Sequence, residues 1–153
     1  MTQYQRKRGS SPLQKDSNQP SLPAGYLKDG YFDKDDNLLP QVIQDWPETL
    51  AKTFVREKMT STQLRRFFNR VRAIEQQNLP FVRLKEDILS IKPIAAASVG
   101  RETAPPIFKE FIDKNVHLAI ESPDSFKRGF LTHFQSVVAY LKYYEQSSKG
   151  ARR

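Results

Sequence analysis

The sequence predicts an all-α protein, a compact bundle of about five helices that ends in a long C-terminal helix. Apolar residues recur at helical spacings of three, four and seven in several segments. No segment shows the strict apolar and polar alternation of a half-buried strand. The 153 residues include 10 Phe, 6 Tyr and 1 Trp, enough large apolar side chains for the core of one domain.

Three parts are expected along the chain. Residues 1–29 are rich in Gly, Ser, Pro, Gln and basic side chains, which predicts a flexible basic arm. Residues 30–146 should form a single helical domain, and residues 147–153 a disordered tail. The first residues lack the apolar region of a signal peptide, and no run approaches the roughly 18 apolar residues of a membrane-spanning helix. We therefore expect a soluble, cytoplasmic protein.

The first half of the domain should contain a short helical turn and two longer helices. Residues 40–43 begin with Pro, which is favoured in the first turn of a helix. Residues 45–58 carry apolar side chains at helical spacing. Thr60 and Gln63 form the capping-box pattern, so the second long helix should cover residues 61–77.

Three more helices are predicted in the second half. Residues 83–97 should form one that Pro93 kinks or breaks, with Gly100 as its terminator. Residues 105–120 begin with a Pro-Pro pair, which suits the first turn of the next helix. Residues 124–146 carry a sustained apolar stripe and should form the last and longest helix.

The predicted helix at residues 60–74 combines an apolar side with an arginine-rich side. The apolar side would be buried and comprises Leu64, Phe67, Phe68, Val71 and Ile74. At 100° per residue, Arg65 and Arg72 share one polar stripe. Arg66 and Arg70 lie on the adjacent flank. No acidic residue interrupts this stretch, whereas an ordinary solvated face would mix the two signs of charge.

The charge of the chain favours a polyanionic partner. The formal net charge is +8, which points to nucleic acid, an anionic membrane surface or an acidic protein. Guanidinium groups match the geometry of phosphate better than lysine does, so four arginines on one helix favour RNA or DNA over a merely soluble basic surface. Further basic candidates are Lys52, Lys58, Lys92, Arg101, Lys127 and Arg128.

The sequence offers little for catalysis or metal binding. The chain has no cysteine, and His117 and His133 belong to no metal-binding or catalytic pattern. Residues 33–37 resemble the opening of a calcium loop, but Leu38 and Gln44 stand where that loop needs Gly and Glu. We therefore expect no catalytic residues, no metal and no cofactor.

Several segments together resemble a known family. They are T-Q-L-R-R-F-F-N-R-V-R, A-A-A-S-V-G-R, F-L-T-H-F-Q-S-V-V-A-Y-L-K-Y-Y and the lead-in G-Y-F-D-K-D-D-N-L-L-P. Their order and spacing over residues 30–145 resemble the small subunit of type III-A CRISPR effector (Csm) complexes. The chain departs from that family in its longer basic N-terminal arm and in having Ser98 and Val99 where a small pair after an aromatic residue is expected.

The resemblance implies an all-helical protein without catalytic activity. Several copies would stack head to tail beside the crRNA-binding backbone subunits and cradle the crRNA and its target RNA. The nuclease and cyclase activities would belong to other subunits. The family's RNA-contacting arginines would fall on Arg65 and Arg101.

Two other protein classes stay open from the sequence. A helix-turn-helix DNA-binding regulator would place residues 60–74 in the major groove, and the preceding short helix and tight turn fit that arrangement. Such a protein would need a dimer and a palindromic duplex, so competition between duplex DNA and single-stranded RNA separates the two. A pure protein–protein adaptor predicts no measurable nucleic-acid affinity for the isolated chain.

Overall fold

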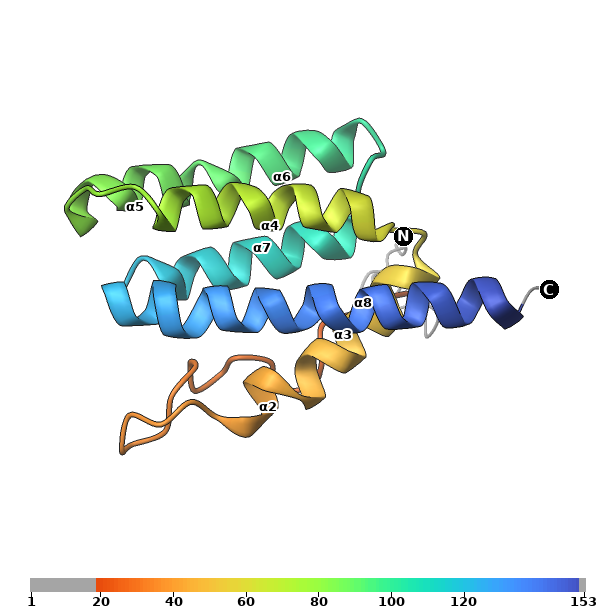
Figure 1. Cartoon of the computed structure of the whole chain (residues 1–153), viewed down its shortest axis with the longest axis horizontal. Coiled ribbons are helices and arrows are strands. Elements are labelled where there is room, and N and C mark those ends of the chain that lie inside the picture. Colours follow the sequence, from red (N-terminus) through yellow and green to blue (C-terminus); the bar gives the residue numbers. More distant parts are fainter. Residues whose placement is uncertain (1–18, 152–153) are drawn as a thin grey trace, which may run out of the picture.

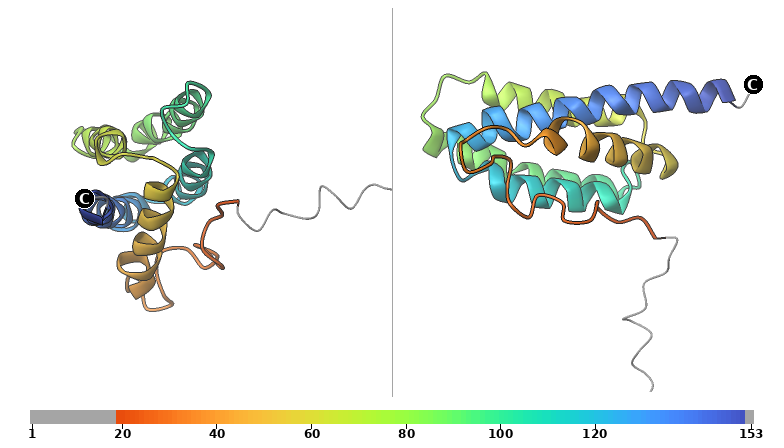
Figure 2. Two further views of the ribbon diagram at one scale, coloured as in Figure 1. Left: turned by 90° about the vertical axis from the view of Figure 1, so that its right-hand side faces the viewer. Right: turned by 90° about the horizontal axis from the view of Figure 1, so that it is seen from below.

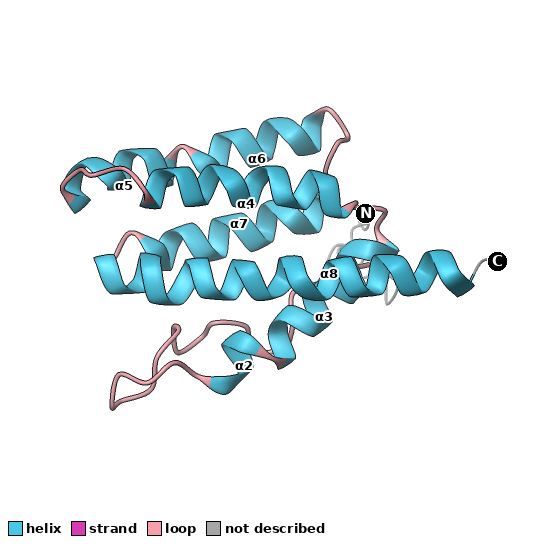
Figure 3. Cartoon of the chain, viewed as in Figure 1, coloured by secondary structure: helices cyan, strands magenta, loops and turns pink. Residues whose placement is uncertain are grey.

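Helices dominate the computed structural model, which describes residues 19–151 (Figures 1 and 3). No strand occurs among these residues, although Phe32 and Leu38 form an isolated β-bridge. The predicted all-α bundle with a long C-terminal helix is therefore confirmed. The elements are α2 (Pro40–Ile43), α3 (Asp45–Arg56), α4 (Ser61–Glu75), α5 (Phe81–Leu89), α6 (Ile91–Gly100), α7 (Pro106–Ala119), the π-helical turn η2 (Ser125–Phe130) and α8 (Leu131–Ala151).

The start of α4 is fixed by two sets of hydrogen bonds. In the predicted capping box, Thr60 Oγ1 accepts from the Gln63 N–H at 3.1 Å and Gln63 Oε1 accepts from the Thr60 N–H at 2.9 Å. From α8, the Glu145 carboxylate accepts from Ser61 N at 3.0 Å and from Ser61 Oγ at 2.7 Å. A carboxylate is favoured there because a helix N-terminus carries partial positive charge. The arginine-rich helix is thus tied to α8.

The break predicted near Pro93 is present. α5 ends at Leu89 and α6 begins at Ile91, so Pro93 lies in the first turn of a new helix, where its missing N–H is tolerated. The connection turns at Ser90, whose N–H donates to the Glu86 carbonyl at 3.1 Å.

The ends of α3 and α6 share one geometry. Lys58 follows α3 with a φ of 74°, and Glu102 follows α6 with a φ of 63°. In each case the next N–H donates at 2.9 Å to a carbonyl of the last helical turn, which is the Schellman arrangement. The sequence predicts that Gly100 provides the left-handed residue that ends this helix. In the structure Gly100 is the last residue inside α6, and Glu102 adopts the left-handed conformation instead.

The N-terminal segment, residues 19–39, packs against the bundle. Tyr26 and Leu27 are only 4% and 3% exposed, although both fall within the arm predicted at residues 1–29. The predicted boundary is therefore too late, because contacts with distant helices bury side chains that local composition left unassigned. Residues 1–18 of the predicted arm lie outside the described residues.

The last helix extends past its predicted end. α8 continues to Ala151, beyond Gln146, and Figure 2 shows its C-terminal end projecting past the other helices. The turn that leads into η2 and α8 begins at Ser122, whose Oγ accepts from the Ser125 N–H at 3.0 Å. None of the described helices is long and apolar enough to cross a membrane.

Aromatic rings fill the centre between α3, α4, α7 and α8. Phe111 of α7 lies edge to face against Phe54 of α3 and Phe134 of α8, with ring centroids 5.6 and 5.4 Å apart. Phe68 of α4 packs on the same Phe134 at 5.4 Å. The buried side predicted for α4 is confirmed at Leu64, Phe67, Phe68, Val71 and Ile74. The opposite side of α4 therefore faces outward.

Candidate nucleic-acid interface

The outward side of α4 presents four cations, which we call the arginine surface: Arg65, Arg66, Arg70 and Arg72. All four residues are exposed, and none of them forms an ion pair within the part of the chain that the structure describes. The buried apolar side fixes the rotation of α4, so the guanidinium groups cannot turn inward without exposing the core. Their charges are therefore available to a partner.

The arginine surface divides between the two sides of α4. Arg72 lies towards α8, because its Cζ is 6.0 Å from the centroid of the Phe68 ring that packs on α8. Arg65 precedes it by nearly two helical turns on the same stripe. Arg66 and Arg70 lie on the other side and face α6. The stripe and the flank expected from helical periodicity are thus separate surfaces.

A groove between α4 and α6 brings three arginines together. Arg66 and Arg70 line it from α4, and Arg101 lines it from the end of α6. The groove encloses about 230 Å³ and contains no carboxylate side chain. Its remaining lining residues are Gln63, Phe67, Ile94, Ser98 and Thr103. The arginines were predictable from the sequence but their convergence was not, because Arg101 lies on another helix.

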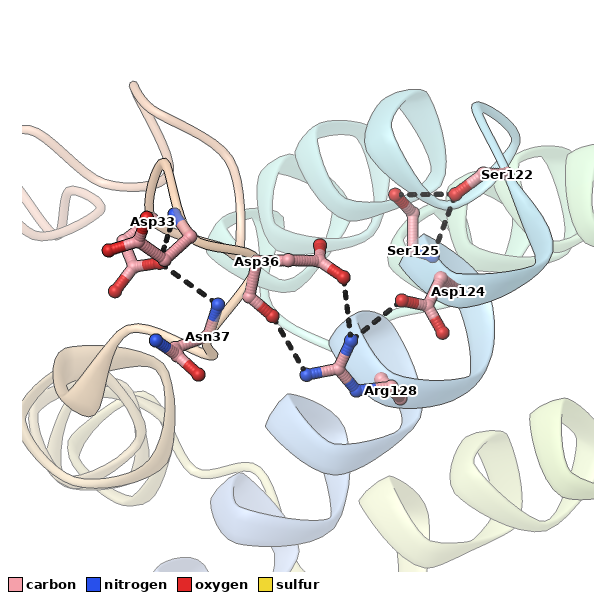
Figure 4. Close-up of polar contacts among 8 residues, drawn as sticks. Asp33, Asp36, Asn37, Ser122, Asp124, Ser125 and Arg128 are labelled. Carbon is pink, nitrogen blue, oxygen red and sulfur yellow. Dashed lines mark hydrogen bonds and ion pairs between the residues drawn. The ribbon is translucent and has the colours of Figure 1, made fainter.

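Arg128, another predicted contact, has partners inside the chain (Figure 4). Its Nη1 lies 2.7 Å from Asp124 Oδ2 and 3.5 Å from Asp36 Oδ2, and its Nη2 donates to the Asp36 carbonyl at 3.1 Å. The guanidinium also lies 4.7 Å from the centroid of the Phe32 ring. Hydrogen bonding to Asp124 raises the pKa of Arg128. This arginine fastens the N-terminal segment to η2.

The acidic turn that resembles a calcium loop is closed by its own hydrogen bonds (Figure 4). Asp33 Oδ1 accepts from the backbone N–H of Asp35 at 2.8 Å and of Asn37 at 2.9 Å. The hydrogen bond from Asn37 lowers the pKa of Asp33. Over residues 19–151, no group of three or more His, Cys, Asp or Glu side chains is arranged to hold a metal ion.

A buried hydrogen-bond network joins the N-terminal segment to α7 and α8. We call it the polar seam, and its side chains are Tyr26, Tyr31, Asn115 and His133. Asn115 Nδ2 donates to Tyr26 Oη at 2.9 Å, and Asn115 Oδ1 accepts from Tyr31 Oη at 2.7 Å. Burial raises the pKa of both tyrosines. The seam is polar like the arginine surface, but the hydrogen-bond partners of its side chains lie within the chain.

The position of the proton on His133 follows from its partners. Nδ1 lies 2.7 Å from the Val42 carbonyl, which only accepts, so Nδ1 carries the hydrogen. In a neutral ring Nε2 must then accept, and Tyr26 Oη donates to it at 2.6 Å. Burial lowers the pKa of His133 to about 4, so the ring is neutral at pH 7. This histidine is structural, which the sequence left undecided.

The remaining predicted contacts are dispersed. Lys52 Nζ lies 5.2 Å from the centroid of the Tyr144 ring. Lys92 is half-buried beside a separate cavity of about 710 Å³, which Lys28, Glu110 and Asp113 also line. The two other lysines are exposed at the end of α3 and in η2, at Lys58 and Lys127. Of the predicted residues, only Arg66, Arg70 and Arg101 converge on one groove, while Arg65 and Arg72 share the stripe on the other side of α4.

Comparison with known families identifies the chain. A family model described as Csm2 Type III-A matches residues 39–147, which include α4, the groove, α7 and most of α8. The chain belongs to the Csm2 family. Csm2 membership makes it a small subunit of the type III-A CRISPR effector, the Csm complex, and confirms the family resemblance of the sequence. Comparisons of this Csm2 chain with curated proteins and with solved structures gave no match.

Proposed function

We propose that this Csm2-family protein is a non-catalytic, RNA-binding structural subunit of a cytoplasmic antiviral ribonucleoprotein. The observation that supports this function is the arginine surface, which presents four exposed guanidinium groups without ion-pair partners among the described residues. Its ligand would be the sugar-phosphate backbone of the crRNA, of the target RNA, or of both.

The mechanism of binding would be charge neutralisation on a rigid support. Arginine forms two parallel hydrogen bonds with phosphate oxygens, and each contact releases condensed counterions. The start of α4 is held by its capping box and by Glu145, so the guanidinium groups project from a fixed axis. Contacts to phosphate carry no sequence information directly, so binding should depend little on base sequence.

Protein partners would cover other faces. We propose that several copies stack and contact the backbone and large subunits of the Csm complex. Exposed apolar side chains support such contacts: Val82 is 68% exposed and Leu89, seven residues later on the same side of α5, is 43% exposed. On the C-terminal half of α8, Tyr143 is 63% exposed. Apolar groups of this size in solvent are suited to protein contacts.

Salt-dependent binding tests the RNA-binding function. Unrelated single-stranded RNAs should bind with similar affinity, and log affinity should fall with log salt by roughly 0.7 per neutralised phosphate. Replacing Arg65 and Arg72 together with Ala should reduce this affinity and leave the melting temperature nearly unchanged, because neither side chain is buried. Arg83→Ala, an exposed arginine on α5, is the matched control.

The outcome also separates the alternatives. Salt-insensitive or sharply sequence-selective RNA binding would contradict the proposal. Preferential competition by a palindromic duplex DNA would support a helix-turn-helix regulator instead. A loss of folding in the double variant would show that Arg65 and Arg72 are structural.

A further inference from the structure

The groove between α4 and α6 has the features of a site for a single phosphate group. We infer that Arg66, Arg70 and Arg101 together hold one phosphate there. Arg66 and Arg70 are one helical turn apart on α4, and Arg101 approaches from the end of α6. At about 230 Å³, the groove is smaller than the roughly 300–1,000 Å³ of ordinary small-molecule pockets, so it suits a compact group.

The charges around the groove favour an oxyanion. Three guanidinium groups line it and no carboxylate does. Glu102 follows Arg101 directly, but with its left-handed backbone it lines a neighbouring cavity together with Glu57 and Lys58. The two nearby acids thus line the adjacent cavity, where Lys58 also lies, and no carboxylate offsets the three arginines of the α4–α6 groove.

The C-terminal end of α6 can accommodate an anion, although a helix dipole is negative at that end. A helix C-terminus ordinarily repels an anion through its free carbonyl groups. Here the Ala97 carbonyl accepts from Arg101 N at 2.9 Å. The Ser98 carbonyl accepts from Thr103 N at 2.9 Å and from Thr103 Oγ1 at 3.1 Å. These carbonyls are therefore occupied.

The rest of the lining suits the sugar that accompanies a backbone phosphate. Phe67 is 7% exposed and Ile94 is half-buried, so the groove offers apolar surface beside its cations. Ser98 Oγ lies 3.5 Å from Arg101 Nη2 and can steady the guanidinium. The ligand is thus a phosphodiester group with its ribose. Only the source of this phosphate, a bound RNA, rests on the proposed function.

The groove is separate from the stripe on the other side of α4. Arg65 and Arg72 lie towards α8 and do not line it. The two sets of arginines should therefore contact different phosphates. The flank arginines Arg66 and Arg70 thereby acquire a specific role of their own.

The phosphate site can be tested without RNA. Inorganic pyrophosphate, titrated into the isotope-labelled full chain, should shift the NMR signals of the Arg66, Arg70 and Arg101 Nε–H groups together and leave that of Arg83 in place. The shifts of Arg66 and Arg70 should weaken in Arg101→Gln, a variant that leaves no core residue altered. Equal shifts at all exposed arginines, or no shift at the three, would overturn the inference.

RNA binding gives a second test, in which failure of the phosphate site can be distinguished from failure of the proposed function. Arg70→Gln and Arg101→Gln should each lower RNA affinity about fivefold to tenfold, and the double variant should lose less than the product of the two, because both residues contact one group. In the triple variant, which adds Arg66→Gln to these two changes, the salt slope should fall by about 0.7, the value for one phosphate. A fall of about 2 would mean three separate phosphates and would overturn the inference. Absence of RNA binding by the unaltered chain would contradict the proposed function alone, because the pyrophosphate test is independent of it.

Discussion

The arginine surface and the polar seam are both polar, but they differ in where their partners lie. Every seam side chain bonds to another part of the same chain, and the seam is shielded from water. The arginines of α4 stay exposed and have no ion-pair partner among the described residues. Polar residues that hold the fold and polar residues available for a ligand can thus be separated by burial and pairing, and variants of each should affect different measurements.

The largest effect on stability is expected from Asn115→Leu. The change leaves the buried Tyr31 hydroxyl only the long 3.4 Å hydrogen bond to the backbone carbonyl of residue 115, and it removes the amide donor to Tyr26. Buried polar groups without partners cost about 1–3 kcal/mol each, so we expect the free energy of unfolding to fall by about 3–4 kcal/mol. Chemical denaturation measures this, with RNA affinity at a temperature where the variant is folded as the second readout. Reduced RNA affinity with unchanged stability would mean that Asn115 serves ligand binding and not the fold, which would contradict the comparison.

Acid should weaken the seam through His133. Its pKa is about 4 in the folded chain and 6.5 ordinarily, so the unfolded chain takes up the proton first as the pH falls. The stability contributed by the neutral ring is complete above pH 6.5 and is lost towards pH 4, by about 3 kcal/mol. Unfolding measured at several pH values should show this loss. It should persist in His117→Gln and disappear in His133→Gln.

Gly129→Ala tests how closely the N-terminal segment fits. A Cβ at Gly129 would lie 2.4 Å from Cδ2 of the Tyr31 ring, so the ring must move and the seam with it. We expect a loss of about 2 kcal/mol in the free energy of unfolding, despite the better helix propensity of Ala. Gly100→Ala is the matched control, because its Cβ would meet nothing within 4 Å and should be neutral or stabilising. Equal effects at both positions would contradict the close fit.

Arg128→Gln should have the smallest effect and sharpens the comparison most directly. Arg128 is an arginine in a basic chain, yet its guanidinium is paired with Asp124 and Asp36. Half-exposed ion pairs contribute little, so the melting temperature should fall only slightly. RNA affinity should match that of Arg83→Ala. A loss comparable to that of the Arg65 and Arg72 double variant would mean that Arg128 leaves its partners to bind RNA.

The helices were predictable because their determinants are local. The capping box at Thr60, the break at Pro93 and the apolar side of α4 each depend on residues within a few positions. The buried position of Tyr26 was not predictable, since its partners Asn115 and His133 lie far along the chain. Local composition indicated a flexible arm for a residue that the tertiary structure buries.

The candidate site was predictable only as a set of residue types. Four arginines on one side of α4 follow from helical periodicity, and the structure places them there. The family resemblance set Arg101 apart as an RNA contact, but nothing in the sequence showed that Arg128 meets two carboxylates while Arg101 lines a groove without any. Which cations form ion pairs within the chain depends on tertiary contacts, and the spacing of residues in the sequence does not reveal those contacts.

The hydrogen bonds of the polar seam also have a direction. The Val42 carbonyl can only accept, which fixes the proton of His133, then the donor role of Tyr26, and then the amide orientation of Asn115. One backbone oxygen on α2 therefore decides the sense of a hydrogen-bond chain that extends into α7. No single hydrogen bond in this chain can exchange its donor and acceptor without the others changing too. The N-terminal segment therefore packs on the bundle in a single arrangement.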